Sequence, residues 1–554
     1  MKWWQKTVVY ECYPKSYLDT GGKGTGTIRG ITAKLDYLKS LGTGAIWLTP
    51  VYRSPMKDNG YDVADYYDID PSFGTMKDME ELIAEGKKRG IQIVMDLVLN
   101  HTSDQNAWFQ ESRKSRHNPK SDWYIWKDPK EDGSAPTNWR SIFGGSAWTW
   151  CEERQQYYLH TFAGCQPDLN WENPQVRKAA ADIACFWVKK GVGGFRIDAI
   201  TYIRKPDVYR DGKADGEDGL SSIHPLTANQ PGILDYLKEF RSRIPAYGTD
   251  GKEIFMVAEA NGVKADELPQ WTRKNGVFDM LLEFSHVDLQ FQSGEVWCRP
   301  TEWKLSDLKH ALNASEENTS RDGWYPVFFE NHDQPRSINH YFHNDHNAIE
   351  KAKILGMILY TMRGTPFLYQ GEELGYTNVK WNSIDQYDDI SSHGQYAFAL
   401  KEGFSEKEAL ECVHAWSRDN ARTPMQWDDT VNAGFTSGKP WLPVHDDYRN
   451  QNVMKESQDP DSVLSWYRKL AEIRKQESVL TEGDYHPVLE ESEDILAFTR
   501  ETEKETVLIM TNFTDHEVTF DPNMTENMAC LLSNFTFENG TLKPYQAVLL
   551  KEKK

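Results

Sequence analysis

The chain has 554 residues, a formal net charge of −21, 39% hydrophobic residues and 27% charged residues. This composition is that of an ordinary globular protein, and at about 100–200 residues per domain the length predicts about three domains. The negative charge argues against nucleic acid or an anionic membrane as a partner. A neutral small molecule is compatible with it, whereas an anionic ligand would need a local basic pocket.

The first residues, MKWWQKTVVYECYPKSYL, mix charged and aromatic side chains and lack the apolar run of a secretory signal. No apolar stretch approaches the length of a membrane helix. The seven cysteines are scattered and form no CxxC pair, which disfavours a zinc site and fits reduced thiols. We therefore expect a cytoplasmic protein.

Short apolar strands alternate with amphipathic segments over most of the chain. Eight strands are predicted, at Val8–Tyr10, Ala45–Thr49, Ile91–Leu97, Gly194–Ala199, Ile254–Glu259, Phe278–Phe284, Pro326–Glu330 and Pro366–Tyr369. An example of the intervening segments is Lys77–Arg89, which has a helical pattern. Such alternation predicts a parallel sheet, and eight units favour an α/β fold with a closed (β/α)8 barrel.

Two long segments interrupt this alternation. Residues 102–171 follow the third strand, contain many Trp, Gly, Pro and Asn residues, and show little helical periodicity, so they predict a small inserted domain. Residues 374–428 follow the eighth strand. Both would project from the carboxyl-terminal face of the barrel, where barrel enzymes place their active sites.

The pattern changes again at about residue 479. Four strands separated by turns are predicted there, at Ile495–Thr499, Thr506–Asn512, His516–Phe520 and Gln546–Leu550. We therefore expect three domains: a catalytic barrel at 1–101 and 172–478, the inserted domain at 102–171, and a C-terminal all-β sandwich at 479–554.

Polar residues gather where four of the predicted barrel strands end. They are Asp96, Asn100 and His101 in DLVLNHTS, Arg196 and Asp198 in GFRIDAI, Glu259 in VAEANG, and His332 and Asp333 in FFENHDQPR. An ordinary ion pair explains any one of these carboxylates equally well. It does not explain a set that recurs at four strand ends facing one side of a barrel.

The two carboxylates Asp198 and Glu259 have different predicted surroundings. Arg196 and Asp198 are two residues apart, so they share a strand face, with Phe195 and Ile197 on the other. We expect the arginine to keep Asp198 ionised, as a nucleophile requires. Glu259 ends an apolar strand, which would raise its pKa as a general acid requires. Two carboxylates in these states are the machinery of retaining glycoside hydrolysis.

These four stretches resemble the conserved regions of the α-amylase superfamily, glycoside hydrolase family thirteen. QPDLNW at 166–171, DNGYD at 58–62 and SRDNARTPMQW at 417–427 resemble motifs of its oligo-1,6-glucosidase and α-glucosidase subfamily. The resemblance covers nearly the whole chain. It implies a retaining α-glucosidase that cleaves short α-glucosides such as isomaltose and isomalto-oligosaccharides, with maltose and sucrose as further candidates.

The resemblance also implies the roles of individual residues. Asp198 would be the nucleophile, Glu259 the general acid/base, and Asp333 would hold two hydroxyls of the distorted sugar ring. The other implied substrate contacts are His101, Arg196 and His332 to the same sugar, Tyr61 and Phe162 as its apolar wall, Asp58 and Arg418 at its terminal hydroxyls, and Phe143 near the leaving group. A pocket closed by Asp58 and Arg418 implies release of one glucose from the non-reducing end. The mechanism needs no cofactor.

Two positions depart from the family pattern. Many relatives bind calcium in an N-terminal loop that here reads DTGGKGTGTIRG, from Asp19 to Gly30. Because most acidic and amide ligands are replaced, we expect no metal there and the Lys23 ammonium in its place. After the nucleophile stands Ala199, where α-1,6-selective relatives usually have Val. The smaller residue would widen the neighbouring subsite, a change worth about 1–3 kcal/mol of discrimination.

Three other functions remain open from the sequence. A trehalose-6-phosphate hydrolase would need basic residues beside the leaving sugar, for which Arg204, Lys205 and Arg210 are candidates. A sucrose isomerase or glucosyltransferase would intercept the covalent intermediate with a sugar. An inactive binding or transporter-associated homologue would usually lack the nucleophile or the acid, and both are present here. We expect a small disaccharide or oligosaccharide substrate and a monomer or weak oligomer.

Overall fold

The computed structural model describes residues 1–272, 276–291, 296–320, 322–342 and 346–553. Its centre is an eight-stranded parallel sheet in the order β13-β12-β10-β5-β2-β1-β15-β14. The strands are β1 Val8–Cys12, β2 Thr43–Leu48, β5 Gln92–Val98, β10 Gly194–Asp198, β12 Phe255–Glu259, β13 Met280–Leu282, β14 Pro326–Val327 and β15 Thr365–Tyr369. All eight predicted strands are therefore confirmed, and they form a nearly closed barrel.

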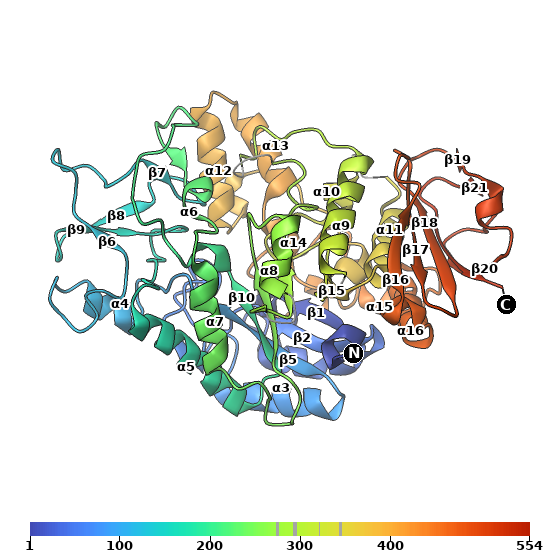
Figure 1. Ribbon diagram of the computed structural model, residues 1–554, viewed down its shortest axis with the longest axis horizontal. Helices are drawn as coiled ribbons and strands as arrows, with labels where there is room; N and C mark the ends of the chain where they lie inside the picture. The colour runs from blue at the N-terminus through green and yellow to red at the C-terminus, as the bar shows by residue number, and fades with distance from the viewer. Residues whose placement is uncertain (273–275, 292–295, 321, 343–345, 554) are drawn as a thin grey trace.

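Helices surround the barrel (Figure 1). The longer ones are α3 Met76–Lys88, α5 Pro174–Lys190, α7 Ile233–Arg243, α9 Leu305–Thr319, α11 Ala348–Thr361 and α16 Val463–Gln476. Helix α3 matches the predicted segment, and its sequence explains its start. The Thr75 side chain accepts from the Asp78 N–H while Asp78 accepts from the Thr75 N–H, a capping box.

Strand β10 shows how the barrel sorts its side chains. Phe195 and Ile197 point outward into the core between strands and helices. On the inner side, Val9, Trp47, Val94, Val257 and Phe367 belong to a separate core that fills the barrel. Arg196 and Asp198 alternate with the outward residues, as predicted, and all five residues of the strand are buried. The strand thus delivers its polar side chains to the interior end of the barrel.

The segment after β5 forms the inserted structure at the left of Figure 1. It contains helix α4 Ala107–Ser112 and a three-stranded antiparallel sheet of β6 Trp126–Lys127, β9 Gln156–Leu159 and β8 Trp148–Cys151. Its own small core includes Ile125, Trp139, Trp148 and Leu159. Aromatic packing thus explains the Trp-rich composition of this segment.

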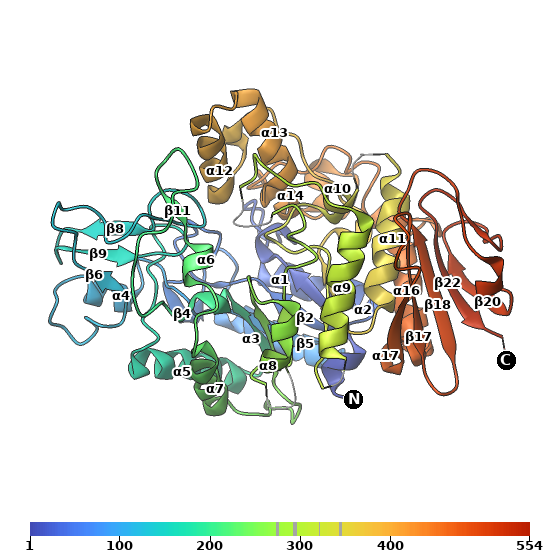
Figure 2. The same ribbon diagram turned by 45° about the horizontal axis from the view of Figure 1, so that its top comes forward.

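The second insertion carries helices α12 Ile390–Lys401, α13 Glu406–Trp416 and α14 Asp419–Arg422. Helices α12 and α13 stand at the top of the molecule in Figures 1 and 2. They rise beside the inserted sheet rather than beside the C-terminal domain. The two insertions therefore flank the same face of the barrel.

The C-terminal region, at the right in Figure 1, is a five-stranded antiparallel sheet in the order β16-β17-β18-β22-β20. Its strands are β16 Asp484–Val488, β17 Ile495–Glu501, β18 Thr506–Asn512, β20 Met528–Ser533 and β22 Ala547–Glu552. The predicted strand at His516–Phe520 is the short β19 Val518–Thr519, which pairs with β21 Thr541–Leu542. Strands β16 and β20 were not predicted. β16 reads DYHPV and has no apolar run, and β20 reads MACLLS but is half-exposed or exposed at every position.

No helix in the described part of the chain has both the length and the apolar character that a membrane crossing requires.

Candidate active site

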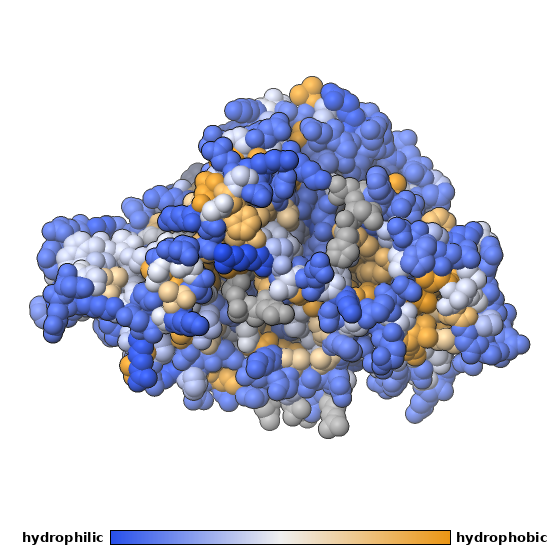
Figure 3. All heavy atoms as spheres, turned by 90° about the horizontal axis from the view of Figure 1, so that it is seen from above, coloured by the Kyte–Doolittle hydropathy of each residue, from blue (hydrophilic) through white to orange (hydrophobic). Residues whose placement is uncertain are grey.

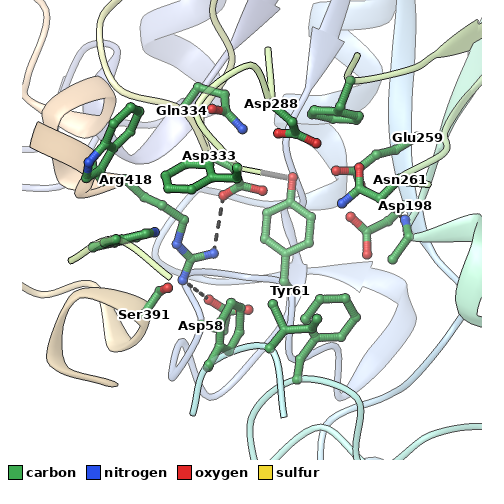
Figure 4. A pocket seen from close by; sticks show the side chains of 18 of the residues that line it. Asp58, Tyr61, Asp198, Glu259, Asn261, Asp288, Asp333, Gln334, Ser391 and Arg418 are labelled. Carbon is green, nitrogen blue, oxygen red and sulfur yellow. Dashed lines mark hydrogen bonds and ion pairs between the residues drawn. The ribbon is translucent and has the colours of Figure 1, made fainter. Parts of the chain in front are cut away.

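A pocket opens on the face flanked by the two insertions. Its lining comes from barrel strand ends, from the inserted domain (Ile142, Phe143, Phe162) and from the second insertion (Ser391, Trp416, Arg418). In Figure 4 the side chains of Asp198 and Glu259 lie together on one side of Tyr61, and Arg418 lies on the other with Asp58 and Asp333. Seen from above in Figure 3, the surface of the molecule is mainly hydrophilic, with hydrophobic patches between. The pocket thus has a carboxylate side and an arginine side.

Arg196 is the centre of the carboxylate side. Its Nη1 donates to Asp198 Oδ1 at 2.7 Å and to both oxygens of Asp96 at 2.9 Å, and its Nη2 donates to Glu259 Oε2 at 2.5 Å. The guanidinium is 1% exposed. One buried guanidinium therefore binds both Asp198 and Glu259.

Arg196 lowers the pKa of Asp198, as predicted, but it does not bring that pKa down to its ordinary value. Burial raises the pKa of Asp198 well above its ordinary value, and the nearby carboxylates of Glu259, Asp96 and Asp333 add to this rise while Arg196 opposes it. The reason is that Arg196 is shared among three buried carboxylates. Its single charge cannot offset the desolvation and the mutual repulsion of the group.

The main chain after the nucleophile candidate also contacts Glu259. Ala199 has the left-handed conformation, with φ 45° and ψ 40°, and its N–H donates to Glu259 Oε2 at 3.2 Å. Both donors to Glu259, from Arg196 and Ala199, thus meet at Oε2. A proton on the other oxygen, Oε1, would be the one offered to a ligand in the pocket.

His332 and Asp333 follow strand β14 and form a charged chain with Glu11 of β1. His332 Nδ1 lies 2.6 Å from Glu11 Oε1, and its Nε2 lies 3.2 Å from Asp333 Oδ2. Burial lowers the pKa of His332, but Asp333 and Glu11 together raise it to about 9. The imidazole is therefore a cation at neutral pH, flanked by two carboxylates.

Asp333 receives two further cations from the second insertion. Arg422 Nη2 lies 2.6 Å and Arg418 Nη1 lies 3.2 Å from Asp333 Oδ1. Burial raises the pKa of Asp333, but His332, Arg418 and Arg422 outweigh it and bring the pKa well below its usual range. Asp333 is thus ionised at any pH near neutral and is held rigidly at the pocket wall.

Aromatic and neutral groups line the base of the pocket. The Tyr61 ring stacks on His332 with 5.1 Å between centroids, and its hydroxyl donates to Asp96 at 3.0 Å. His101 packs against Phe162 at 5.2 Å, and burial lowers its pKa to about 4. His101 is therefore neutral at physiological pH and can exchange hydrogen bonds without adding charge.

The closed end of the pocket is built on Arg418. Its Nη2 lies 3.1 Å from Asp58 Oδ1 and 2.6 Å from Asp389 Oδ1, and its guanidinium lies 4.6 Å from the centre of the Phe143 ring. Gln166, from the QPDLNW motif, donates to Asp58 Oδ2 at 2.8 Å. The inserted domain and the second insertion thus meet at Arg418 and shut the pocket on this side.

Residues 11–483 match the family model described as alpha amylase, catalytic domain, and residues 487–549 match that described as maltogenic amylase, C-terminal domain. The chain is a glycoside hydrolase of the α-amylase family. It is 42% identical to an oligo-1,6-glucosidase of Parageobacillus thermoglucosidasius and 40% identical to a trehalose-6-phosphate hydrolase of Bacillus subtilis, with 98–99% of each chain covered. The structure of an isomaltulose synthase from Protaminobacter rubrum matches with a TM-score of 0.93 and 38% identity over the whole of both chains.

In this α-amylase family member, the N-terminal loop that binds calcium in many relatives is filled by hydrogen-bond donors. The Asp19 carboxylate accepts from the Gly21 N–H at 2.7 Å, the Gly24 N–H at 2.6 Å and the Thr436 hydroxyl at 2.6 Å. The Lys23 side chain is exposed. The prediction that its ammonium takes the place of the metal is therefore wrong: two main-chain amides and the Thr436 hydroxyl hold the Asp19 carboxylate instead.

The three basic residues considered for a phosphate lie away from the glycosidase pocket. Lys205 is buried against Asp168 at 2.7 Å and Asn100 at 2.9 Å, and Arg204 pairs with Asp207 at 2.9 Å. Neither they nor Arg210 are among the described residues that line the pocket. They do not supply a phosphate site beside the reacting bond.

Several residues of the site were not singled out from the sequence. Glu11 carries a signal, because it is the charged residue in an otherwise apolar, fully buried strand, VVYEC. Arg422 also carried a signal, because it lies four residues after Arg418 in SRDNARTPMQW. Asp389 lies in the second insertion, and nothing in its local pattern indicates that it approaches the barrel. The place of Asp389 and Arg422 follows from the packing of α12–α14 over the pocket.

Proposed function

We propose that the protein is a retaining, exo-acting α-glucosidase that releases glucose from the non-reducing end of isomaltose and short isomalto-oligosaccharides, with maltose and sucrose as further candidate substrates. The observation that carries this proposal is the pair Asp198 and Glu259 held by one guanidinium in a pocket closed at Arg418. The close relationship to oligo-1,6-glucosidases supports the linkage.

In the first step, the Asp198 carboxylate attacks the anomeric carbon. The bond from this carbon to the glycosidic oxygen breaks as the proton of Glu259 passes to that oxygen, and the leaving sugar departs as an alcohol. Arg196 remains bonded to Asp198 throughout and stabilises the ester that forms. The product of this step is a covalent glucosyl enzyme and an ionised Glu259.

In the second step, Glu259 removes a proton from water, and the water oxygen attacks the anomeric carbon. The ester bond to Asp198 breaks and glucose leaves with its original configuration. Charge at the ring is greatest in the two transition states, when it resembles an oxocarbenium ion. The permanently ionised Asp333 is placed to hold the ring hydroxyls at that stage.

The electrostatics favour a neutral substrate. Of the described residues that line the pocket, five are carboxylates (Asp58, Asp198, Glu259, Asp288 and Asp333), and Arg418 is the one arginine or lysine among them. Arg418 already pairs with three carboxylates. A phosphorylated leaving sugar would meet net negative charge, which argues against trehalose-6-phosphate as the substrate.

The test is glucose release from isomaltose, maltose, sucrose, trehalose and trehalose-6-phosphate at equal concentration, with the anomer of the released glucose followed by proton NMR. Release of α-glucose from isomaltose supports the proposal. Release from trehalose-6-phosphate alone would overturn the substrate, and first appearance of β-glucose would overturn the retaining mechanism.

We also propose that the enzyme works in the cytoplasm as a monomer or weak oligomer. All seven cysteines are free thiols, as a reducing compartment requires. Light scattering coupled to gel filtration measures the mass, and a stable assembly of several subunits at micromolar concentration would contradict the oligomeric part.

A further inference from the structure

A second cavity, of about 560 Å³, adjoins the catalytic pocket. The two share the lining residues Ile142, Phe162, Asn261, Asp288 and Phe291. The closed end of the catalytic pocket, at Asp58 and Arg418, does not contribute to the second cavity. The second cavity therefore continues the binding site in the direction of the leaving sugar, and its volume lies within the range of about 300–1,000 Å³ that holds ligands larger than a single sugar.

The far part of this cavity is built around Arg140 and Asp215. Strand β7 Trp139–Arg140 pairs with β11 Ser221–Ser222, which brings the segment after the nucleophile strand against the inserted domain. Arg140 Nη1 lies 2.5 Å from Asp215 Oδ1, and the Ser222 N–H donates to Asp215 Oδ2 at 2.8 Å. Both oxygens of Asp215 are thus fixed in place by donors.

Asp215 still has room to bind a ligand. A carboxylate has about four acceptor sites, and Arg140 and Ser222 occupy two of them. The Asp215 side chain is 42% exposed, while that of Arg140 is 9% exposed. The remaining sites of Asp215 face solvent at the cavity wall, where a pre-oriented carboxylate accepts hydroxyl protons without losing further conformational freedom.

The cavity suits a sugar better than an anion. The Arg140 charge is matched by Asp215 and by Asp218, whose Oδ1 lies 2.5 Å from Nη2. Phe398 lies under the Arg140 guanidinium at 5.0 Å and lines the same cavity, as does Phe291. Aromatic rings beside a hydrogen-bonding carboxylate match the apolar faces and hydroxyl edges of glucose units.

We propose that this cavity binds the third glucose unit of an α-1,6-linked oligosaccharide and that Asp215 is the residue which selects for chains longer than a disaccharide. This inference rests on the proposed α-glucosidase function. It predicts that kcat/KM rises from isomaltose to isomaltotriose by about tenfold, since a hydrogen bond to a charged group contributes enough for that factor.

The experiment compares kcat/KM for isomaltose, isomaltotriose and isomaltotetraose in the intact enzyme and in Asp215→Ala. The bidentate contact of Arg140 with Asp218 remains in this variant, so Arg140 is not left unpaired. The expected result is loss of most of the preference for the trisaccharide, with the rate on isomaltose retained. Ser222→Trp, which fills the cavity from strand β11, should collapse the ratio in the same way.

Asp207→Ala is the matched control. Like Asp215, Asp207 lies on the segment after the nucleophile and pairs with an arginine, here Arg204, but it lines neither cavity. Its trisaccharide-to-disaccharide ratio should equal that of the wild type. Equal kcat/KM for the three sugars, or an unchanged ratio in Asp215→Ala, would overturn the inference while leaving the proposed function intact. Failure to cleave any of the three would contradict the proposed function itself.

Discussion

The Ala199 N–H donates to Oε2 of Glu259 at 3.2 Å, so the residue after one candidate carboxylate orients the other. Ala199 itself adopts a left-handed conformation, with φ 45° and ψ 40°. Together with Arg196 it occupies Oε2 and directs Oε1 toward the pocket. The geometry therefore assigns different tasks to two carboxylates that share one guanidinium.

Exchanging each carboxylate for alanine should separate these tasks. Asp198→Ala removes the nucleophile and should abolish turnover, and added azide should then attack from the vacated side to give β-glucosyl azide. Glu259→Ala should lower kcat by roughly 10²–10⁴-fold on isomaltose, less on an aryl glucoside, and azide should give the α-glucosyl azide. NMR of the azide products distinguishes the two, and reversed anomers would exchange the assigned roles.

Substitution of Ala199 tests the strained turn. A β-branched side chain is disfavoured at φ 45°, so Ala199→Val should destabilise the fold by about 1–3 kcal/mol. The added methyl groups also narrow the subsite and should raise the isomaltose-to-maltose ratio of kcat/KM. Denaturant unfolding and kinetics on both sugars measure these effects. A variant as stable as the wild type would contradict the strain argument.

The raised pKa of Asp198 predicts the shape of the pH–rate profile. Asp198 must lose its proton to attack, so the acidic limb of kcat/KM should lie at clearly higher pH than that of an ordinary aspartate, near 3.9. Measurement of kcat/KM on an aryl α-glucoside between pH 3 and 10 gives this limb. An acidic limb at or below about pH 4 would mean that Arg196 dominates after all.

Glu11 should stabilise the protein in a pH-dependent way through His332. The pKa of His332 in the folded protein is about 9, above the ordinary histidine value of 6.5. The stabilisation from protonated His332 is therefore complete below about pH 6.5 and disappears as the pH rises through 9. Glu11→Gln removes one of the two carboxylates that raise the pKa of His332 and so makes that rise smaller. The difference in Tm between wild type and variant should therefore be largest near pH 6 and smaller at pH 10. A difference that is constant across this range would show that His332 is not protonated in the folded state.

Arg418 should matter for both stability and binding. Arg418→Ala leaves Asp58, Asp389 and Asp333 without a shared buried cation, which should cost about 3–5 kcal/mol and raise KM strongly. Arg204→Ala is the control, because Arg204 pairs with one exposed aspartate outside the pocket. Denaturant unfolding and kinetics on isomaltose compare the two. Similar small effects in both variants would argue against Arg418 as the closing residue.

The sequence by itself determined the barrel and the residues at its strand ends. The eight strands and helix α3 are visible in short-range patterns, because alternation and helical periodicity are local properties. The clustering of Asp198, Glu259 and Asp333 also follows, since parallel strands of one barrel end on the same face. The predicted domain boundaries remain predictions. The C-terminal strand β16 escaped detection because DYHPV has no apolar run, and β20 was missed although MACLLS is apolar.

Only the tertiary structure decided what surrounds those residues. Burial, together with the nearby carboxylates that share Arg196, raises the pKa of Asp198, and the spacing of Arg196 and Asp198 in the sequence could not reveal this. The approach of Asp389 and Arg422, the remoteness of Arg204 and Lys205, and the second cavity depend on how the insertions pack over the barrel. The Thr436 hydroxyl that donates to Asp19 lies 417 residues away along the chain. Electrostatic energies depend on distance and burial in three dimensions, and these are fixed by packing between segments that lie hundreds of residues apart.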